Sequence, residues 1–132
     1  MKTIYLIACC SKKLKGIYPA EKLYQSDLFK KSLAYAKSKK ADAIYILSAK
    51  HHLVSLREEL KDYNVTLNDF SVADKKTWAE KVLSLLKEKC DLQNDHIVFL
   101  TGNNYRKYLL PHIKNYEIPL AGLKIGEQLQ WL

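Results

Sequence analysis

The sequence is poor in the residues that mark disulfide-rich or zinc-binding proteins, with only three cysteines among 132 residues. Cys9 and Cys10 are neighbours that can bridge only in a strained ring, and Cys90 lies far away in the chain. No Cys-x-x-Cys spacing is present, so neither a disulfide framework nor a cysteine zinc site is predicted. Three free thiols fit a reducing compartment best.

Long hydrophobic runs are also missing, because no apolar stretch approaches the roughly 20 residues that a helix needs to cross a bilayer. The apolar run at residues 4–9 is too short for a signal-peptide core, and no small-residue cleavage pattern follows it. An apolar fraction of 48% with 27% charged residues is typical of a globular protein. We therefore expect a cytoplasmic protein, built as a single domain over residues 1–132, that does not associate with a membrane.

Negative charge is scarce in the first third of the chain. The net charge is +8, and residues 1–40 hold ten lysines against Glu21 and Asp27, so the remaining residues balance to zero. An anionic partner would therefore be attracted mainly to this first third. The alternative interpretation is that the lysines of residues 30–40 form only the solvated face of a helix.

Three short apolar segments are predicted to be β-strands. Residues 3–8, 43–47 and 96–101 are rich in β-branched and aromatic side chains and are apolar at successive positions. This pattern is typical of strands that are buried on both faces. We expect the first strand to be central in the sheet.

Helical patterns alternate with these strands. Ser26 can cap a helix that runs to about residue 40, and Ser71 can cap a second helix that runs to about residue 90. A short helix over residues 104–111 and an amphipathic segment over residues 124–132 follow. Alternating strands and helices predict right-handed crossovers, and hence an α/β fold: a Rossmann-like three-layer sandwich with a mostly parallel central sheet.

The second strand is followed by residues 48–70, which are predicted to form one long polar connection. This segment holds His51, Tyr63 and Thr66, and it is longer than a typical connection. Loops of this kind often carry function, so we treat the segment as a candidate functional loop.

Polar residues follow each of the three strands directly. They occupy residues 10–13, 48–52 and 101–105. In open parallel sheets, ligands bind beyond the carboxyl ends of the strands, so these turns should converge on one site.

The first turn offers groups that suit a phosphate. Ser11 and Lys12 can supply a hydroxyl and an ammonium group, helped by backbone N–H groups, although the glycines of a Walker motif are absent. In the alternative interpretation Ser11 caps the turn and the lysines are solvated. Cys10 is a candidate nucleophile, whereas many free cysteines are simply small buried hydrophobic residues.

The second turn holds the best acid–base candidates. An imidazole such as that of His51 ordinarily titrates near neutral pH, and the ammonium group of Lys50 can polarise a carbonyl or hold a phosphate. A metal site is not predicted from His51 and His52, because consecutive side chains diverge and no acidic or thiol cluster lies near them in the sequence.

A glycosidic reaction would need a carboxylate to stabilise positive charge on the sugar. The carboxylates near the middle loop are Glu58, Glu59, Asp62 and Asp69. Their spacing singles out none of them, and a solvated acidic turn is the favoured interpretation.

Tyr24 and Ser26 lie at the entry to the lysine-bearing helix, where N–H groups and the helix dipole favour an anion. A plain N-cap role for Ser26 is the alternative. Tyr24, Tyr63 and Tyr105 can stack on a base, although aromatic residues among apolar ones are commonly part of the core.

Several motifs together resemble a family of small uncharacterised bacterial and phage proteins over almost the whole chain. The motifs are Cys10-Ser11-Lys12, Leu23-Tyr24-Gln25-Ser26, Leu47-Ser48-Ala49-Lys50-His51, Tyr63 with Thr66, Thr101-Gly102 with Tyr105, and Pro119-Leu120 with Gly122 and Gly126. A more distant similarity links the chain to the YaaA-type proteins and to the Cys-Ser-Lys-bearing domain of archaeosine synthase, both connected with nucleic acids or modified bases.

This resemblance implies a Rossmann-like site for a nucleotide, a nucleobase or another phosphate-bearing ligand. The residues on its motif positions are Cys10, Ser11, Lys12, Tyr24, Ser26, Ser48, Lys50, His51, Tyr63, Thr66, Gly102 and Tyr105. The family pattern reads Lys-His-Gly-Leu in the middle loop, and here His52 stands in the glycine position. Because a left-handed backbone is strained without glycine, we expect either a different loop or a changed activity.

The first hypothesis for function is an enzyme that acts on a nucleotide or modified base, with hydrolysis or exchange of an N-glycosidic bond as the candidate reaction. In it Lys50, His51 and Cys10 are catalytic, Lys12 faces the phosphate, and no metal or cofactor is required. The alternative is a non-catalytic module that binds nucleic acid through the basic N-terminal third.

Overall fold

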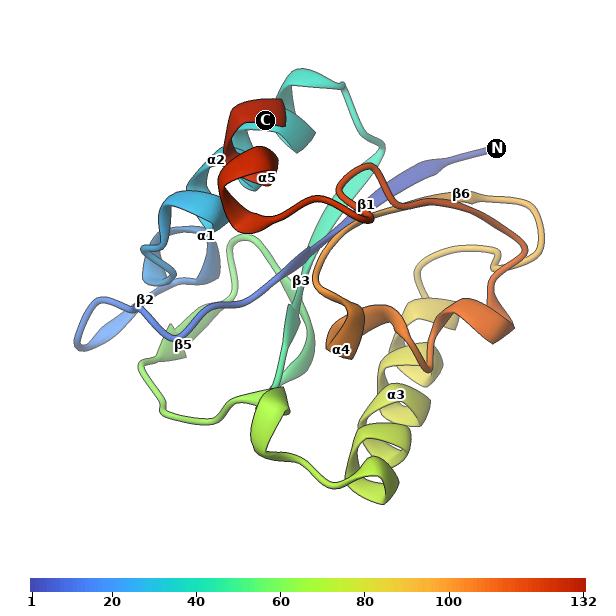
Figure 1. The fold of residues 1–132 in the computed structure, drawn as a ribbon. Coiled ribbons are helices and arrows are strands. Elements are labelled where there is room, and N and C mark those ends of the chain that lie inside the picture. The colour runs from blue at the N-terminus through green and yellow to red at the C-terminus, as the bar shows by residue number, and fades with distance from the viewer.

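The computed structural model describes all of residues 1–132 (Figure 1). Five strands form one sheet in the order β4-β3-β1-β6-β7. Their bounds are Thr3–Ala8 for β1, Ala43–Ser48 for β3, His52–Ser55 for β4, His96–Leu100 for β6 and Asn115–Glu117 for β7. A second, two-stranded sheet pairs β2 (Ile17–Pro19) with β5 (Glu59–Lys61) in antiparallel fashion.

The large sheet is mostly parallel, as the sequence predicts. β1 pairs in parallel with β3 on one side and with β6 on the other, and β7 continues the parallel arrangement beyond β6. β1 is therefore central, which confirms that prediction. β4 alone runs antiparallel, as the second strand of a hairpin with β3.

Two long helices begin at the predicted caps. α2 (Asp27–Ser38) begins after Ser26, whose side chain accepts a hydrogen bond from the N–H group of Phe29. α3 (Val72–Lys87) begins in the same way after Ser71. The shorter helices are α1 (Ala20–Leu23), α4 (Asn103–Arg106) and α5 (Ile125–Trp131), with 3₁₀ turns at Leu67–Asp69 and Leu110–His112. No helix is both long enough and apolar enough to span a membrane.

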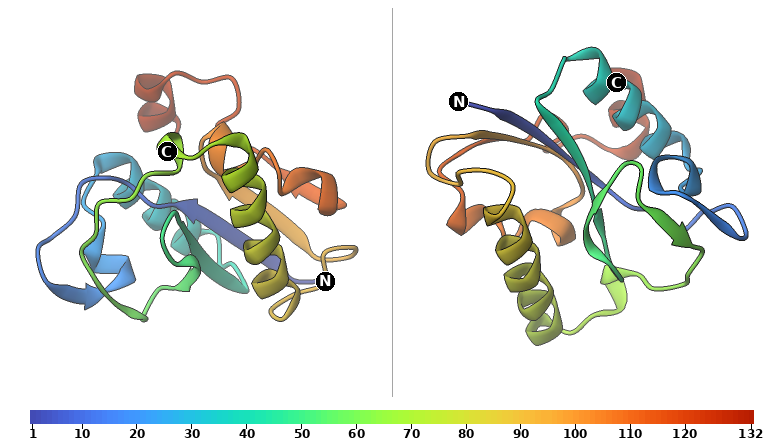
Figure 2. Two further views of the ribbon diagram at one scale, coloured as in Figure 1. Left: turned by 90° about the horizontal axis from the view of Figure 1, so that it is seen from below. Right: turned by 180° about the vertical axis from the view of Figure 1, so that it is seen from behind.

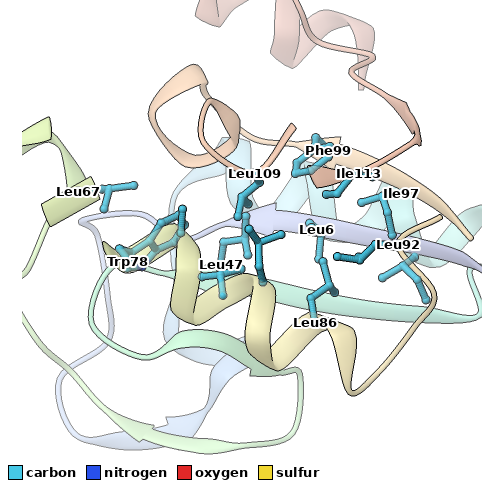
Figure 3. Packing of buried hydrophobic residues seen from close by; sticks show 14 of the residues in the cluster. Leu6, Leu47, Leu67, Trp78, Leu86, Leu92, Ile97, Phe99, Leu109 and Ile113 are labelled. Carbon is cyan, nitrogen blue, oxygen red and sulfur yellow. The ribbon is translucent and has the colours of Figure 1, made fainter. Parts of the chain in front are cut away.

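The helices pack on both faces of the large sheet, as the two views in Figure 2 show. α3 covers one face, where Leu6, Leu86 and Phe99 are buried together (Figure 3). α1, α2 and α5 lie on the other face, over a core that includes Tyr5 and Ile7. Successive residues of β1 thus enter opposite cores, because side chains alternate across a strand.

The prediction that residues 48–70 form one long polar connection is wrong. This segment contains β4, β5 and the 3₁₀ turn Leu67–Asp69. Each strand in it has one buried side chain, Val54 or Leu60, and its neighbours in the same strand are more exposed. Such short strands give little periodicity, and β5 pairs with a segment at least 40 residues away, so local sequence does not reveal them.

The helix predicted over residues 104–111 is also shorter than expected. α4 ends at Arg106, and the chain continues into the 3₁₀ turn Leu110–His112, which has proline near its start. Pro111 lacks the N–H group that a continuing α-helix requires, so the long helix is interrupted.

Candidate functional site

The sheet reverses its direction of winding at β1. The chain passes from β1 to β3 on one side, and later from β3 to β6 on the other side of β1. α2 makes the first connection on one face, and α3 makes the second on the opposite face. Ligands of open α/β sheets bind at such a switch point, outside the carboxyl ends of the strands.

The three polar turns do meet at one edge. Ala8 of β1 is paired with Leu47 of β3, and Ile7 is paired with Leu100 of β6. Since all three strands run in the same direction, the residues after each of them lie at the carboxyl edge. This confirms that the three turns share one edge of the sheet.

A cavity of about 250 Å³ opens at this edge, and we call it the main cavity because it lies among the polar turns. A larger hollow of about 720 Å³ lies at the opposite edge, around residues 90–93 and 111–114, away from these turns. The main cavity lies between the loop after β1, the segment before the 3₁₀ turn Leu67–Asp69, and α4. Its lining residues are Cys9, Cys10, Ser11, Lys13, Asn64, Val65, Thr66, Asn68 and Tyr105. Four of them, Cys10, Ser11, Thr66 and Tyr105, are predicted site residues.

A second space of about 70 Å³, the small cavity, adjoins the main cavity through Cys9 and Cys10, which line both. It lies between the ends of β1 and β6 and the start of α2. Its other lining residues are Ala8, Ser26, Leu28, Phe29, Ser32, Leu100, Thr101, Gly102, Leu120 and Gln128. The predicted residues Ser26 and Gly102 therefore face the small cavity.

Lys13, rather than Lys12, is the lysine that faces the main cavity. Its Nζ lies 4.3 Å from the centre of the Tyr63 ring and 5.7 Å from that of Tyr24, within cation–π range. Lys12 is exposed, and its carbonyl oxygen accepts the N–H group of Gln25 at 2.8 Å. The backbone of Lys12 thus anchors the loop after β1, while the side chain of Lys13 provides the positive charge at the main cavity.

A chain of buried hydroxyl groups lies beneath the site. The Tyr63 hydroxyl is 2.6 Å from the Tyr24 hydroxyl and 2.7 Å from Ser48 Oγ. Ser48 Oγ also accepts the backbone N–H group of His51, and the Ser48 carbonyl accepts Trp78 Nε1–H at 2.9 Å. Tyr24 and Ser48 are almost completely buried, so their hydroxyl groups support the site from within.

Burial keeps these phenols protonated. It raises the pKa of Tyr24 to about 12, and it also raises the pKa of Tyr63. Both hydroxyl groups therefore carry a proton near neutral pH and act as hydrogen-bond donors as well as acceptors.

The phenol of Tyr105 lies beside the Cys9 thiol. Its hydroxyl lies 3.2 Å from Cys9 Sγ, and its ring packs edge-on against Trp78. Burial, and then the neighbouring Cys9 side chain, raises the pKa of Tyr105, so the phenol keeps its proton and can donate to Cys9 Sγ. Cys10 Sγ instead donates to the carbonyl oxygen of Lys12 at 3.2 Å, and both thiols are free.

Lys50 and His51 lie next to the Tyr63 ring and line neither the main nor the small cavity. Lys50 is exposed, with its Nζ 5.8 Å from the Tyr63 ring centre, and the His51 ring meets the same ring edge-on at 5.3 Å. Lys50 lines a separate, wide depression of about 400 Å³ together with His52. Burial, and then the charge of Lys50, lowers the pKa of His51. A catalytic role for either residue stays a prediction.

His52 adopts a left-handed backbone at the position where the resemblance led us to expect glycine. Its φ is 67°, and it follows the three-residue turn between β3 and β4. Three-residue hairpin loops commonly end in such a residue. The conformation is therefore present without glycine, at a cost of roughly 1–2 kcal/mol.

Sequence reasoning missed Cys9, Asn64, Asn68 and Thr101 as site residues, all of which line a cavity. Cys9 and Thr101 lie at the ends of predicted strands, so that position would have found them. Asn64 and Asn68 lie within two residues of Tyr63 or Thr66, and that proximity is their only signal. Thr66 lies between the two asparagines and caps the 3₁₀ turn by accepting the N–H group of Asn68.

No carboxylate lines the main or the small cavity. Among the acidic candidates, Asp62 accepts the N–H group of Gly16 at 2.9 Å and so holds a turn, and Glu58, Glu59 and Asp69 are exposed. No three His, Cys, Asp or Glu side chains gather in a way that could hold a metal ion. The site therefore consists of thiols, hydroxyl groups, amides and one ammonium group.

A protein-family model matches residues 4–132, and its description is a family of unknown function, DUF6884. The chain belongs to DUF6884. Searches of curated proteins and of solved structures found no match. Because the match runs from β1 to the last residue, both cavities lie within the region that defines DUF6884.

Proposed function

We propose that this protein is an enzyme that binds a nucleobase or nucleotide in the main cavity. The observation that carries the proposal is the main cavity itself, which joins Lys13, two thiols and the Tyr105 phenol at the switch point of the sheet. In α/β proteins such crevices are where nucleotide ligands bind. We infer a Rossmann-like three-layer sandwich, and the similarity to YaaA-type proteins and archaeosine synthase supports a role in base or nucleic-acid modification.

The size and lining of the main cavity suit a base. About 250 Å³ lies just below the range of roughly 300–1,000 Å³ that is usual for drug-sized ligands, which favours a single ring system. Asn64 and Asn68 bring amide groups, which can both donate to and accept from the edge of a base. Lys13 brings positive charge for a carbonyl oxygen or a phosphate.

The lining residues favour chemistry by a thiol or an amine. Cys9, Cys10 and Lys13 are the strongest nucleophile candidates in the main cavity, and Cys9 has a phenol as its hydrogen-bond partner. Hydrolysis or exchange of an N-glycosidic bond would need a carboxylate from elsewhere, because none lines the cavity. We therefore propose addition to the base, with the Cys10 or Cys9 thiol as the attacking group. The new carbon–sulfur bond replaces the π bond of a ring C=C or C=N, and the thiol proton passes to the other atom of that double bond, so no leaving group is needed.

A thermal-shift screen of nucleobases, nucleosides and nucleotides tests the proposal. A ligand present at 100 times its Kd adds about 2.7 kcal/mol to the stability of the folded protein, which is readily seen as a rise in Tm. We expect at least one compound that contains a base to raise the Tm of the wild type. Lys13→Met removes the ammonium group and should lower the affinity for that compound roughly tenfold or more.

Lys39→Met is the matched control for Lys13→Met. Lys39 also has its Nζ over a tyrosine ring, at 5.2 Å from Tyr35, but it lies at the end of α2 and lines neither cavity. Lys13→Met loses its cation–π contacts with Tyr63 and Tyr24, and Lys39→Met loses the one with Tyr35, but only Lys13→Met should lose affinity for the ligand. Equal affinity in the two variants, or no binding of any compound, would refute the proposed site.

The second candidate function is a non-catalytic nucleic-acid-binding module. It is favoured by the exposure of Lys30, Lys37 and Lys40 on or just after α2. Only one lysine of the chain forms an ion pair, Lys37 with Glu21, so the other lysines keep their positive charge for an anionic partner. Its signature is affinity for long DNA or RNA that falls steeply with salt concentration. Binding of small nucleotides with a weak salt dependence would instead support the enzyme.

A further inference from the structure

Asn68 lines the main cavity from the 3₁₀ turn Leu67–Asp69, and the two ends of its amide have opposite hydrogen-bonding character. Its Oδ1 atom can only accept a hydrogen bond, whereas its Nδ2 group can only donate. The neighbours of the side chain decide which end is left for a ligand. These neighbours are Asn104 on α4 and Lys75 on α3, and both are partly buried.

A relay of hydrogen bonds fixes the direction of the Asn68 amide, and it starts at a group that can only donate. Lys75 Nζ donates to Asn104 Oδ1 at 3.4 Å. Because an ammonium group cannot accept, the Asn104 amide turns its Oδ1 atom towards Lys75. The Nδ2 group of Asn104 then faces Asn68 and donates to Asn68 Oδ1. The acceptor end of Asn68 is thus engaged inside the protein, and its Nδ2 donors are left for the main cavity.

Other side chains of the main cavity also offer donors. The Lys13 ammonium group gives one proton to the carbonyl oxygen of Ser11 at 3.5 Å and keeps two for a ligand. Thr66 Oγ1 accepts the backbone N–H group of Asn68 at 3.3 Å, so its own hydroxyl proton is available to a ligand. No Asp or Glu lines the cavity, and Asn64 can present either end of its amide. A ligand in this cavity therefore needs acceptors.

Bases fall into two classes by the group that they present at one ring position. Uracil and hypoxanthine carry a carbonyl oxygen, which accepts, where cytosine and adenine carry an amino group, which donates. An amino group that meets Asn68 Nδ2 or Lys13 Nζ brings two donors together, and both are left without a partner. Asparagine can pair with adenine, but that pairing uses Oδ1 as well as Nδ2. It is closed to Asn68, because Asn68 Oδ1 is turned towards Asn104.

We propose that Asn68 is a specificity-determining residue, by which the main cavity selects bases with a ring carbonyl over bases with an amino group at the same position. We call these two classes oxo bases and amino bases. The inference rests on the proposed function and names its substrate class. Asn68 contacts the base, while Asn104 and Lys75 are positioning residues that keep its donors directed at the ligand.

Matched pairs of bases test the selectivity in the full chain. Uracil is compared with cytosine, and hypoxanthine with adenine, each as the free base, the nucleoside and the monophosphate. Isothermal titration calorimetry gives the affinity of each compound. The oxo base of a pair should bind roughly tenfold tighter or more, because the amino base leaves donors unsatisfied on both sides. Equal affinities, or tighter binding of the amino base, would overturn the inference.

Asn68→Asp replaces the Nδ2 donors with a carboxylate oxygen of nearly the same size. The carboxylate can still accept from Asn104, and the side chain is exposed, so the Tm without ligand should change little. The ratio of oxo-base to amino-base affinity should fall roughly tenfold or more. Comparing the two members of a pair cancels the effect of the added charge on a shared phosphate group.

Asn103→Asp is the matched control for Asn68→Asp. Asn103 is an exposed asparagine at the start of α4 and lines neither cavity, so the control adds the same charge close to the site. It should keep the affinity ratio of the wild type. An equal loss of the ratio in both variants would show that charge, rather than the Asn68 amide, sets the preference, and would overturn the inference.

Asn104→Asp tests the relay while Asn68 itself is kept. A carboxylate can only accept, so it still pairs with Lys75 and requires Asn68 to turn its Nδ2 group towards α4. Asn68 Oδ1 then faces the main cavity, and the affinity ratio should move roughly tenfold or more towards the amino base. A purely structural role of Asn104 would leave this ratio unchanged, and that result would overturn the relay.

The outcomes separate this inference from the proposed function. If compounds with a base bind and Lys13→Met weakens them, but both members of each pair bind equally, the proposed function stands and the selectivity falls. If no compound with a base binds, the proposed function falls, and the selectivity falls with it. If oxo bases bind more tightly and the Asn68 and Asn104 variants change the ratio as expected, both stand.

Discussion

Trp78→Ala should lower the free energy of unfolding by about 3–5 kcal/mol, the range for removing a large aromatic side chain from a core. Trp78 is 3% exposed and packs among Leu47, Leu67 and the α3 side chains (Figure 3). The substitution also removes the donor to the Ser48 carbonyl and the edge contact with Tyr105. Denaturant unfolding followed by far-ultraviolet circular dichroism measures the change without relying on tryptophan fluorescence.

The second tryptophan of the chain provides the comparison. Trp131 is 45% exposed at the end of α5 and packs against Tyr35 on the other face of the sheet. Trp131→Ala should lower the free energy of unfolding by about 1 kcal/mol or less. If Trp78→Ala does not fold, Trp78→Phe gives a smaller loss that can be measured. Similar costs for Trp78→Phe and Trp131→Ala would contradict the role given to Trp78.

Tyr63→Phe should lower the free energy of unfolding by about 1–3 kcal/mol, because it leaves a buried hydroxyl group without its partner. The Tyr63 hydroxyl links Tyr24 to Ser48 at 2.6 and 2.7 Å, and Tyr24 is 1% exposed. The ring itself stays, so the contact with Lys13 is retained. Urea titration of wild type and variant measures the difference.

A double-mutant cycle with Tyr24→Phe shows whether the hydroxyl groups act as a pair. The double variant should lose less stability than the sum of the single variants, because removing both partners leaves no orphaned group between them. Strict additivity would contradict the hydrogen-bonded chain beneath the site.

The sequence is informative where periodic burial decides the structure. Residues 3–8 and 96–101 are apolar at successive positions because both faces of their strands are covered, and Ser26 and Ser71 mark helix starts through local capping. The chain order of these elements determines the carboxyl edge of the sheet. The three polar turns can therefore be assigned to one place from the sequence alone.

The rest of the site depends on contacts between distant residues. Which of two adjacent lysines faces the main cavity is decided by the bridge that pairs Lys13 with Tyr24, and no local pattern contains it. Val54 and Leu60 enter the core from short strands, and β5 pairs with a remote segment, so the local pattern there resembles a polar loop. The direction of the Asn68 amide likewise depends on partners from two helices.

Nuclear magnetic resonance mapping of bound nucleotide tests the central claim most directly. The strongest nucleotide of the thermal-shift screen is titrated into the isotope-labelled full chain, and the backbone amide shifts are followed. Binding at the carboxyl edge predicts the largest changes at residues 9–13, 64–68 and 101–105. Changes confined to the exposed lysines of residues 30–40, or to the opposite edge around residues 90–95, would contradict it.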